Sequence, residues 1–298
     1  MSFEMLMGQA AQLGMAVEAA AAAGMHLRST LDCADIHESV ADHLEQITEL
    51  ALPGASQLPK PQREALAGVL ISILRQAADL VEHPSRAPHW DVTDDVLVQS
   101  TARASMSVAL VLAQVAPQLG DLSQRLAGGG AFLDVGTGAG RLAAVAAQQW
   151  PEAQVHAIDV APKVIETATA TMREFGVDDR AHVRVQDVTE LDSPETYDLI
   201  WLPGPFLSPA LVPTALDRCR DALRPGGWIA FGIYGGPDHP LAQLAADIRT
   251  IRSGGHNWTA DDAGGALIAH GFNEVRELER TWHAPVRLIV GRQTSRSR

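Results

Sequence analysis

This chain of 298 residues has little cysteine, no excess of positive charge and no long apolar run. Its two cysteines, Cys33 and Cys219, have neither metal-ligand nor C-x-x-C spacing, so we expect two small buried or partly buried thiols and no metal site. Lys and Arg number 23 against 36 Asp and Glu, a net charge of −13, and an acidic surface repels phosphate backbones. We therefore expect no nucleic-acid partner and favour a small-molecule substrate.

The sequence also lacks the apolar segments that direct a protein into a membrane or to export. No uninterrupted apolar run approaches the roughly 20 residues that span a bilayer, and the N-terminus lacks the charged and apolar regions of a signal peptide. We expect a cytoplasmic protein without a membrane partner. The hydrophobic content of 46% and the charged content of 20% are those of ordinary globular proteins, and the length suits one large domain or two medium ones.

The hydrophobic periodicity changes once along the chain. Up to residue 125 the patterns are helical, with helices expected near 1–30 (ending close to Gly24), 35–50, 62–81 and 91–117. From Ala131 strand and helix patterns alternate, which predicts an α/β fold with a doubly wound parallel sheet. We expect a helical domain over 1–125 and a second domain over 126–298, with strands at 131–135, 154–159, 181–186, 197–202, 227–234, 273–280 and 285–291.

A glycine-rich turn follows the first predicted strand. It contains Asp134, Gly136, Gly138 and Gly140, and glycine allows a sharp turn and close approach of a ligand to the backbone. A dinucleotide fingerprint G-x-G-x-x-G would require its third glycine where this chain has Arg141. The turn therefore favours a nucleoside cofactor other than NAD, although an NAD-dependent oxidoreductase stays an alternative.

Two further acids close the next predicted strands. Asp159 ends the second strand, 23 residues after Gly136, where a carboxylate can accept both hydrogens of a ribose diol. Asp187 follows the third strand. Either acid alone could be a helix cap, but together with the glycine turn they indicate a nucleoside site.

The combined motifs resemble those of class I S-adenosylmethionine (SAM)-dependent methyltransferases, whose fold is a Rossmann-like seven-stranded doubly wound sheet. An all-helical N-terminal part before this core is similar to bacterial small-molecule O-methyltransferases of secondary metabolism, which implies a homodimer whose helical domain covers the substrate. The resemblance spans about residues 120–292 and rests on residues 132–140, Asp159, 186–187, 197–201, 223–228 and 271–272.

The resemblance also implies a role for each site residue. Methyl transfer to a small aromatic or polycyclic acceptor, by O- or N-methylation, would leave S-adenosylhomocysteine (SAH) as product, and the protein would mainly supply alignment. Asp134 would hold the methionine amino end over the glycine turn, Asp159 the ribose, Asp187 the adenine amine, and Leu202 would lie near the sulfur. The expected cofactor-binding residues are Asp134, Gly136, Gly138, Gly140, Asp159, Val160, Asp187, Val188 and Leu202.

The sequence departs from the family at the catalytic base. Many of these O-methyltransferases carry a His followed by an acid near the end of the central strands, whereas this chain reads Leu-Pro-Gly-Pro-Phe-Leu over 202–207. A SAM-binding enzyme that catalyses a cyclisation or decarboxylation is therefore an alternative of the same fold, and a non-catalytic interaction protein is another reading. The candidate bases are Tyr234, His239, His256 and His89.

Overall fold

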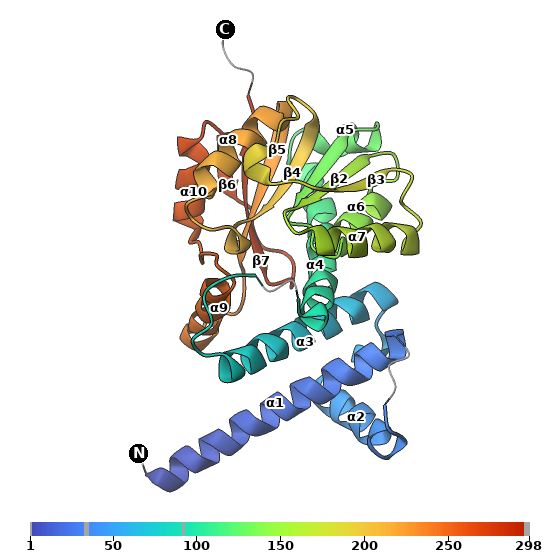
Figure 1. Ribbon diagram of the computed structural model, residues 1–298, viewed down its shortest axis with the longest axis vertical. Helices are drawn as coiled ribbons and strands as arrows, with labels where there is room; N and C mark the ends of the chain where they lie inside the picture. The colour runs from blue at the N-terminus through green and yellow to red at the C-terminus, as the bar shows by residue number, and fades with distance from the viewer. Residues whose placement is uncertain (1, 33–35, 91–92, 295–298) are drawn as a thin grey trace. The chain divides into compact units, whose positions relative to one another are not determined.

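The computed structural model describes residues 2–32, 36–90 and 93–294 (Figure 1). The chain forms two compact units, one of residues 1–85 and 94–106 and the other of residues 86–93 and 107–298. The predicted thiol Cys33 lies outside the described residues, whereas Cys219 is buried.

The first unit is helical throughout its described part. Gly24 does not end the first helix as the sequence pattern suggested, because its backbone packs closely on the third helix: a Cβ at this position would lie 3.1 Å from the side chain of Ile71. Leu27, Ala55 and Ala67 form a small buried core. The elements are α1 (Phe3–Asp32), α2 (Glu38–Ala51), η1 (Ala55–Gln57), α3 (Lys60–Glu82) and α4 (Asp95–Val115), whose second half belongs to the other unit.

The second unit is built around a seven-stranded sheet of order β3-β2-β1-β4-β5-β7-β6. β7 runs antiparallel to β5 and β6, and the other neighbouring pairs are parallel. The strands are β1 (Ala131–Val135), β2 (Gln154–Asp159), β3 (Ala181–Val185), β4 (Tyr197–Pro203), β5 (Leu223–Tyr234), β6 (Asn273–Glu277) and β7 (Val286–Arg292). This topology confirms the predicted fold class.

Helices connect the strands and cover both faces of this sheet (Figure 1). The helices of the α/β part are α5 (Leu122–Ala127), α6 (Arg141–Gln149), α7 (Pro162–Glu174), α8 (Val212–Ala222), α9 (Pro240–Arg252) and α10 (Ala260–Ala269). Three short 3₁₀ helices accompany them: η2 (Ala116–Gln118), η3 (Val188–Glu190) and η4 (Gly204–Phe206).

Alternate side chains of β1 enter two different layers of the core. Leu133 and Val135 are buried with residues of α8 and α10. Phe132 points to the opposite face, where its ring lies 5.5 Å from that of Trp150 at the end of α6. Because β1 is covered on both faces, all five of its residues are buried, as expected for a central parallel strand.

A buried carboxylate joins the amino ends of the central strands. Asp198 of β4 is 2% exposed and accepts hydrogen bonds from Arg224 (2.6 Å), Arg125 (3.4 Å) and the backbone N–H of Ala131 (2.9 Å). The two guanidinium groups compensate the buried charge, so this contact holds β1 and β4 in register with the start of β5.

One helix in the described residues, α4 with the 3₁₀ turn that follows it, is long and apolar enough to cross a bilayer. Half of its apolar window is buried inside the protein, and the core helix of a soluble protein meets the same criteria. Length and composition therefore provide only weak evidence for a membrane span.

Candidate cofactor site

The glycine turn between β1 and α6 has the backbone conformation that its sequence predicts. Gly136, Gly138 and Gly140 have φ angles of 70°, 54° and 82°, in the left-handed region that favours glycine. A Cβ at Gly140 would lie 2.9 Å from the side chains of Ala168 and Met172 on α7, so this glycine permits helix packing. A Cβ at Gly138 would meet no atom within 4 Å, so this glycine faces open space.

Asp134 lies beneath the turn and is almost completely buried, at 1% exposure. Its carboxyl group accepts a hydrogen bond of 2.7 Å from the hydroxyl group of Thr137. Burial raises the pKa of Asp134 to about 7, and the nearby charge of Asp159 acts in the same direction, whereas the Thr137 hydrogen bond opposes it. A cationic ligand at this position would favour the ionised carboxylate.

Asp159, at the end of β2, fixes the turn from the neighbouring strand. One carboxylate oxygen accepts the N–H of Gly138 at 3.0 Å, and the other accepts the N–H of Ala161 at 3.0 Å. Each oxygen keeps a further lone pair, so the carboxylate can still accept ribose hydroxyl groups. The next residue, Val160, is 63% exposed.

Asp187 follows β3 and caps the short helix η3. Its Oδ1 accepts hydrogen bonds of 2.8 Å from both the N–H and the hydroxyl group of Thr189. Asp187 is therefore a helix cap, as the sequence allowed, and its Oδ1 is already engaged by Thr189. In the part of the chain that the structure describes, no hydrogen bond to Oδ2 is found. Val188 beside it is buried.

The end of β4 reaches the same turn. Leu202 is fully buried and pairs with Phe231 of β5. A Cβ at Gly136 would lie 3.7 Å from the ring of Pro203, which places the end of β4 beside the first glycine. The expected cofactor residues thus come from the carboxyl ends of four adjacent strands, where open α/β sheets bind ligands.

The donors and acceptors at this edge suit a cationic nucleoside better than a phosphate. Arg141, the first residue of α6, is directed away from the turn: its guanidinium group lies 3.5 Å from Glu174 and over the ring of Phe175. The three acids supply acceptors for amine and hydroxyl groups, and Gly138 leaves room for close approach. A SAM-like cofactor therefore fits the residues present.

Three of the four candidate bases make hydrogen bonds or close backbone contacts. His239 is the N-cap of α9 and accepts the N–H of Leu241 at 3.2 Å. The hydroxyl group of Tyr234 packs directly against the backbone of Gly236, leaving no room for a side chain there. Both residues therefore have a structural role.

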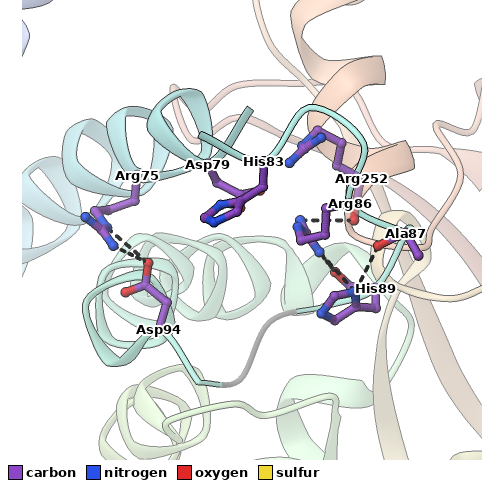
Figure 2. Close-up of polar contacts among 8 residues, drawn as sticks. All are labelled: Arg75, Asp79, His83, Arg86, Ala87, His89, Asp94 and Arg252. Carbon is purple, nitrogen blue, oxygen red and sulfur yellow. Dashed lines mark hydrogen bonds and ion pairs between the residues drawn. The ribbon is translucent and has the colours of Figure 1, made fainter. Parts of the chain in front are cut away.

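The third, His89, is held in a loop next to the end of α9 (Figure 2). Its backbone N–H donates to the carbonyl oxygen of Arg252 at 3.0 Å, and Arg86 donates to its carbonyl oxygen at 2.9 Å. Its Nδ1 lies 2.9 Å from the carbonyl oxygen of Ala87 and 3.1 Å from the Arg86 guanidinium group. Nδ1 of His89 is thus already engaged.

His256 is different, because it is exposed and its ring makes an edge contact with Trp258 at 5.3 Å. No hydrogen bond to either of its ring nitrogens is found within the described residues. The described residues also contain no group of three His, Cys, Asp or Glu side chains that could hold a metal ion.

Thr137 is a site residue that the sequence analysis missed. Its position in the sequence could have revealed this role. Thr137 lies within the glycine turn, three residues after Asp134, and a hydroxyl group at this spacing can reach the carboxyl group. Phe206 and Trp90 were likewise not predicted to meet, yet their rings lie 5.4 Å apart in an edge-to-face arrangement beside the end of β4.

Comparisons with known proteins find methyltransferases. Residues 132–227 match the family model described as a methyltransferase domain. The trans-aconitate 2-methyltransferase of Streptomyces avermitilis is 26% identical over 172 residues, which are 55% of this chain and 58% of that protein. The chain thus aligns with just over half the length of this curated relative.

Two solved structures share the fold over nearly the full chain. Human N-acetylserotonin methyltransferase in complex with SAM matches with a TM-score of 0.65 at 15% identity, covering 98% of each chain. Mitomycin 7-O-methyltransferase matches with a TM-score of 0.64 at 16% identity, also over 98% of each chain.

Proposed function

This chain carries a class I SAM-dependent methyltransferase domain, and we propose that it transfers a methyl group to a small aromatic or polycyclic secondary metabolite, by O- or N-methylation. The observation that carries the proposal is that Asp134 and Asp159 hold a turn whose Gly138 faces open space, while Asp187 follows the strand next to that of Asp159. The comparisons confirm the predicted fold and a methyltransferase domain over residues 132–227. The names of the structural relatives support a small-molecule acceptor.

We assign the cofactor contacts as follows. The buried carboxyl group of Asp134 would take the cationic amino end, because a nearby positive charge compensates its desolvation. Asp159 with Val160 would take the ribose, and Asp187 with Val188 the adenine. Gly136, Gly138 and Gly140 would form the bed beneath the cofactor, and Leu202 would lie near its sulfur.

When bound, SAM supplies a methyl group on a sulfonium that is already a good leaving group. The work left to the protein is alignment of the acceptor, exclusion of water and removal of the acceptor proton. The rigid backbone of the turn, held from β2 by Asp159, and the fully buried Leu202 are suited to the first two tasks.

Calorimetric titration with SAM and SAH tests the cofactor site. We expect both to bind, and we expect Asp159→Asn to weaken binding about 10-fold or more, because hydrogen bonds to a charged group contribute roughly 1.5–3 kcal/mol. Asp179→Asn is the matched control, since that carboxylate is 75% exposed and pairs with the neighbouring Arg180. Wild-type protein that binds neither compound would refute the proposal.

A product assay tests the reaction itself. Purified protein is incubated with SAM and a pool of phenols, amines and polycyclic metabolites, and mass spectrometry follows SAH and methylated product. We expect both to accumulate in equal amounts. SAH without a methylated product, with every acceptor of the pool, would contradict methyl transfer.

A second candidate is a SAM-binding enzyme that catalyses a cyclisation or decarboxylation. It is favoured by the segment from Leu202 to Leu207, which includes the last two residues of β4 and contains no ionisable side chain. In this case the substrate would be converted while SAM is recovered unchanged, which the same mass spectrometry distinguishes.

We further propose that the protein is a cytoplasmic homodimer that assembles through α1. Supporting this, the first half of α1 exposes Phe3, Met5, Leu6, Met7, Leu13, Met15 and Val17. Several exposed large apolar side chains on one helical segment are typical of an interaction site. Light scattering should therefore give a dimer for the wild type and a monomer for Leu13→Glu, with Gln9→Glu as the control on the same helix. The domain division at residue 125 and the substrate-covering role of residues 1–125 stay predictions.

A further inference from the structure

The segment after β4 offers no group to remove a proton from an acceptor, so another part of the chain has to supply one for a hydroxyl substrate. We propose that His256 is this general base, delivered to the end of β4 by the Gly254–Gly255 turn. The inference rests on the proposed methyl transfer and adds its missing catalytic residue.

Backbone packing brings the His256 segment to the end of β4. Gly255 lies so close to the carbonyl group of Pro205 in η4 that a side chain at position 255 has no room. Gly254 has φ +82°, and a Cβ there would lie 3.5 Å from the backbone of His89. The turn is therefore fixed between η4 and the loop of residues 86–90, and His256 follows it directly.

Aromatic contacts also connect His256 to β5. The ring of His256 lies 5.3 Å from that of Trp258, and the ring of Trp258 lies 5.4 Å from that of Phe231, both edge to face. Phe231 pairs with Leu202, the residue expected near the sulfur. The imidazole is thus connected through two ring contacts to the strand pair that ends at the site.

His256 differs from the other two candidate histidines because neither of its ring nitrogens has a hydrogen bond within the described residues. His239 is used as a helix cap, the Tyr234 hydroxyl group is packed against Gly236, and Nδ1 of His89 is engaged by neighbouring groups. No hydrogen bond to His256 occurs among the described residues, and the side chain is exposed. It can therefore accept a proton from an acceptor and release it to solvent.

The proposed step balances without another reagent. The acceptor oxygen forms a bond to the methyl carbon, and the carbon–sulfur bond breaks with its electron pair going to the sulfur, which becomes a neutral thioether. The acceptor proton passes to an unprotonated ring nitrogen of His256 and then to solvent. An acceptor that is already ionised would not need this transfer.

The first test uses NMR and does not depend on turnover. The imidazole signals of SAH-saturated protein are recorded while phenol is added as the probe, and the His256 signal is identified by its loss in His256→Asn. We expect phenol to shift the His256 ring signals and to leave those of His239 in place. Unchanged His256 signals at saturating phenol would overturn the proposal.

The second test compares rates with a hydroxyl acceptor from the product assay. His256→Asn should reduce the rate of SAH formation about 100-fold or more, as for other general bases, with unchanged SAM affinity as evidence of correct folding. His239→Asn is the control and should keep the wild-type rate. A nitrophenol acceptor, already ionised, should reduce the His256→Asn defect to less than about 10-fold.

These results separate the two proposals. Normal SAM binding and methyl transfer together with full activity of His256→Asn would reject His256 as the base and leave the proposed function intact. Failure of the wild type to bind SAM would reject the proposed function, and the role of His256 with it.

Discussion

Replacement of the buried acid beneath the glycine turn should change stability and cofactor binding in opposite directions. Asp134→Asn keeps the shape of the side chain and an oxygen that can accept the Thr137 hydrogen bond. It removes a carboxyl group that is 1% exposed and that no described cation compensates. We therefore expect the variant to be more stable than the wild type at alkaline pH and to bind SAM less well.

The magnitude follows from the pKa of Asp134, which is about 7 in the folded protein against an ordinary value of 3.8. Between these values the folded protein holds a proton that the unfolded chain has lost, so the free energy of unfolding of the wild type falls as pH rises. At about 1.4 kcal/mol for each pH unit, the loss amounts to about 4 kcal/mol by pH 8. Asp134→Asn has no such loss.

Urea unfolding at pH 4, 6 and 8 measures the effect. The stability difference between Asp134→Asn and the wild type should grow by about 4 kcal/mol from pH 4 to pH 8. The exposed control Asp179→Asn should show no such growth. A difference for Asp134→Asn that stays constant over this range would refute the assignment of a desolvated carboxyl group.

Cofactor binding provides the complementary measurement. We expect Asp134→Asn to lower the affinity for SAM about 10- to 100-fold, because a charge-assisted hydrogen bond is lost. Wild-type affinity should also fall as pH decreases from 8 to 6, since Asp134 is protonated below about pH 7 and then carries no negative charge. Equal affinity of the two proteins at pH 8 would show that Asp134 does not contact the cationic end of SAM.

Three further predictions follow from local geometry. Gly140→Ala should reduce the free energy of unfolding by about 1–3 kcal/mol, measured with urea, because its Cβ would clash with side chains of α7. Gly138→Ala should reduce stability less than Gly140→Ala but should weaken SAM binding more, because Gly138 faces open space. Asp198→Asn should cost about 2 kcal/mol, since two guanidinium groups lose their carboxylate, and unchanged stability would contradict that role. Burial raises the pKa of Cys219 to about 12, so in a Cys33→Ser background a thiol reagent at pH 8 should react only after unfolding.

The local signals were strong enough to predict the sheet. The strands over 131–135 and 154–159 have the predicted bounds, because short apolar runs are closed by an acid and a turn. The predicted sharp turn also forms, and its three alternate glycines occupy positive φ values that other residues avoid.

Other local signals were ambiguous or misleading. The sequence analysis did not predict α10, because Gly264 and Gly265 weaken its helical pattern. The helix forms because Thr259 caps it and because Ala263 and Leu267 enter the core beneath the sheet. Gly24 had the opposite effect, suggesting a helix end where the structure has a close helix–helix contact.

The sequence by itself determined the methyltransferase domain over residues 132–227, the order of the strands along the chain and the carboxylates expected at the cofactor edge, because each depends on residues that are close together in the chain. Only the tertiary structure distinguished the four candidate bases. Where each candidate lies depends on groups far away in sequence, such as the carbonyl group of Arg252, which accepts the backbone N–H of His89, or that of Pro205, which packs against Gly255. No periodicity records such contacts, because packing between distant segments creates them.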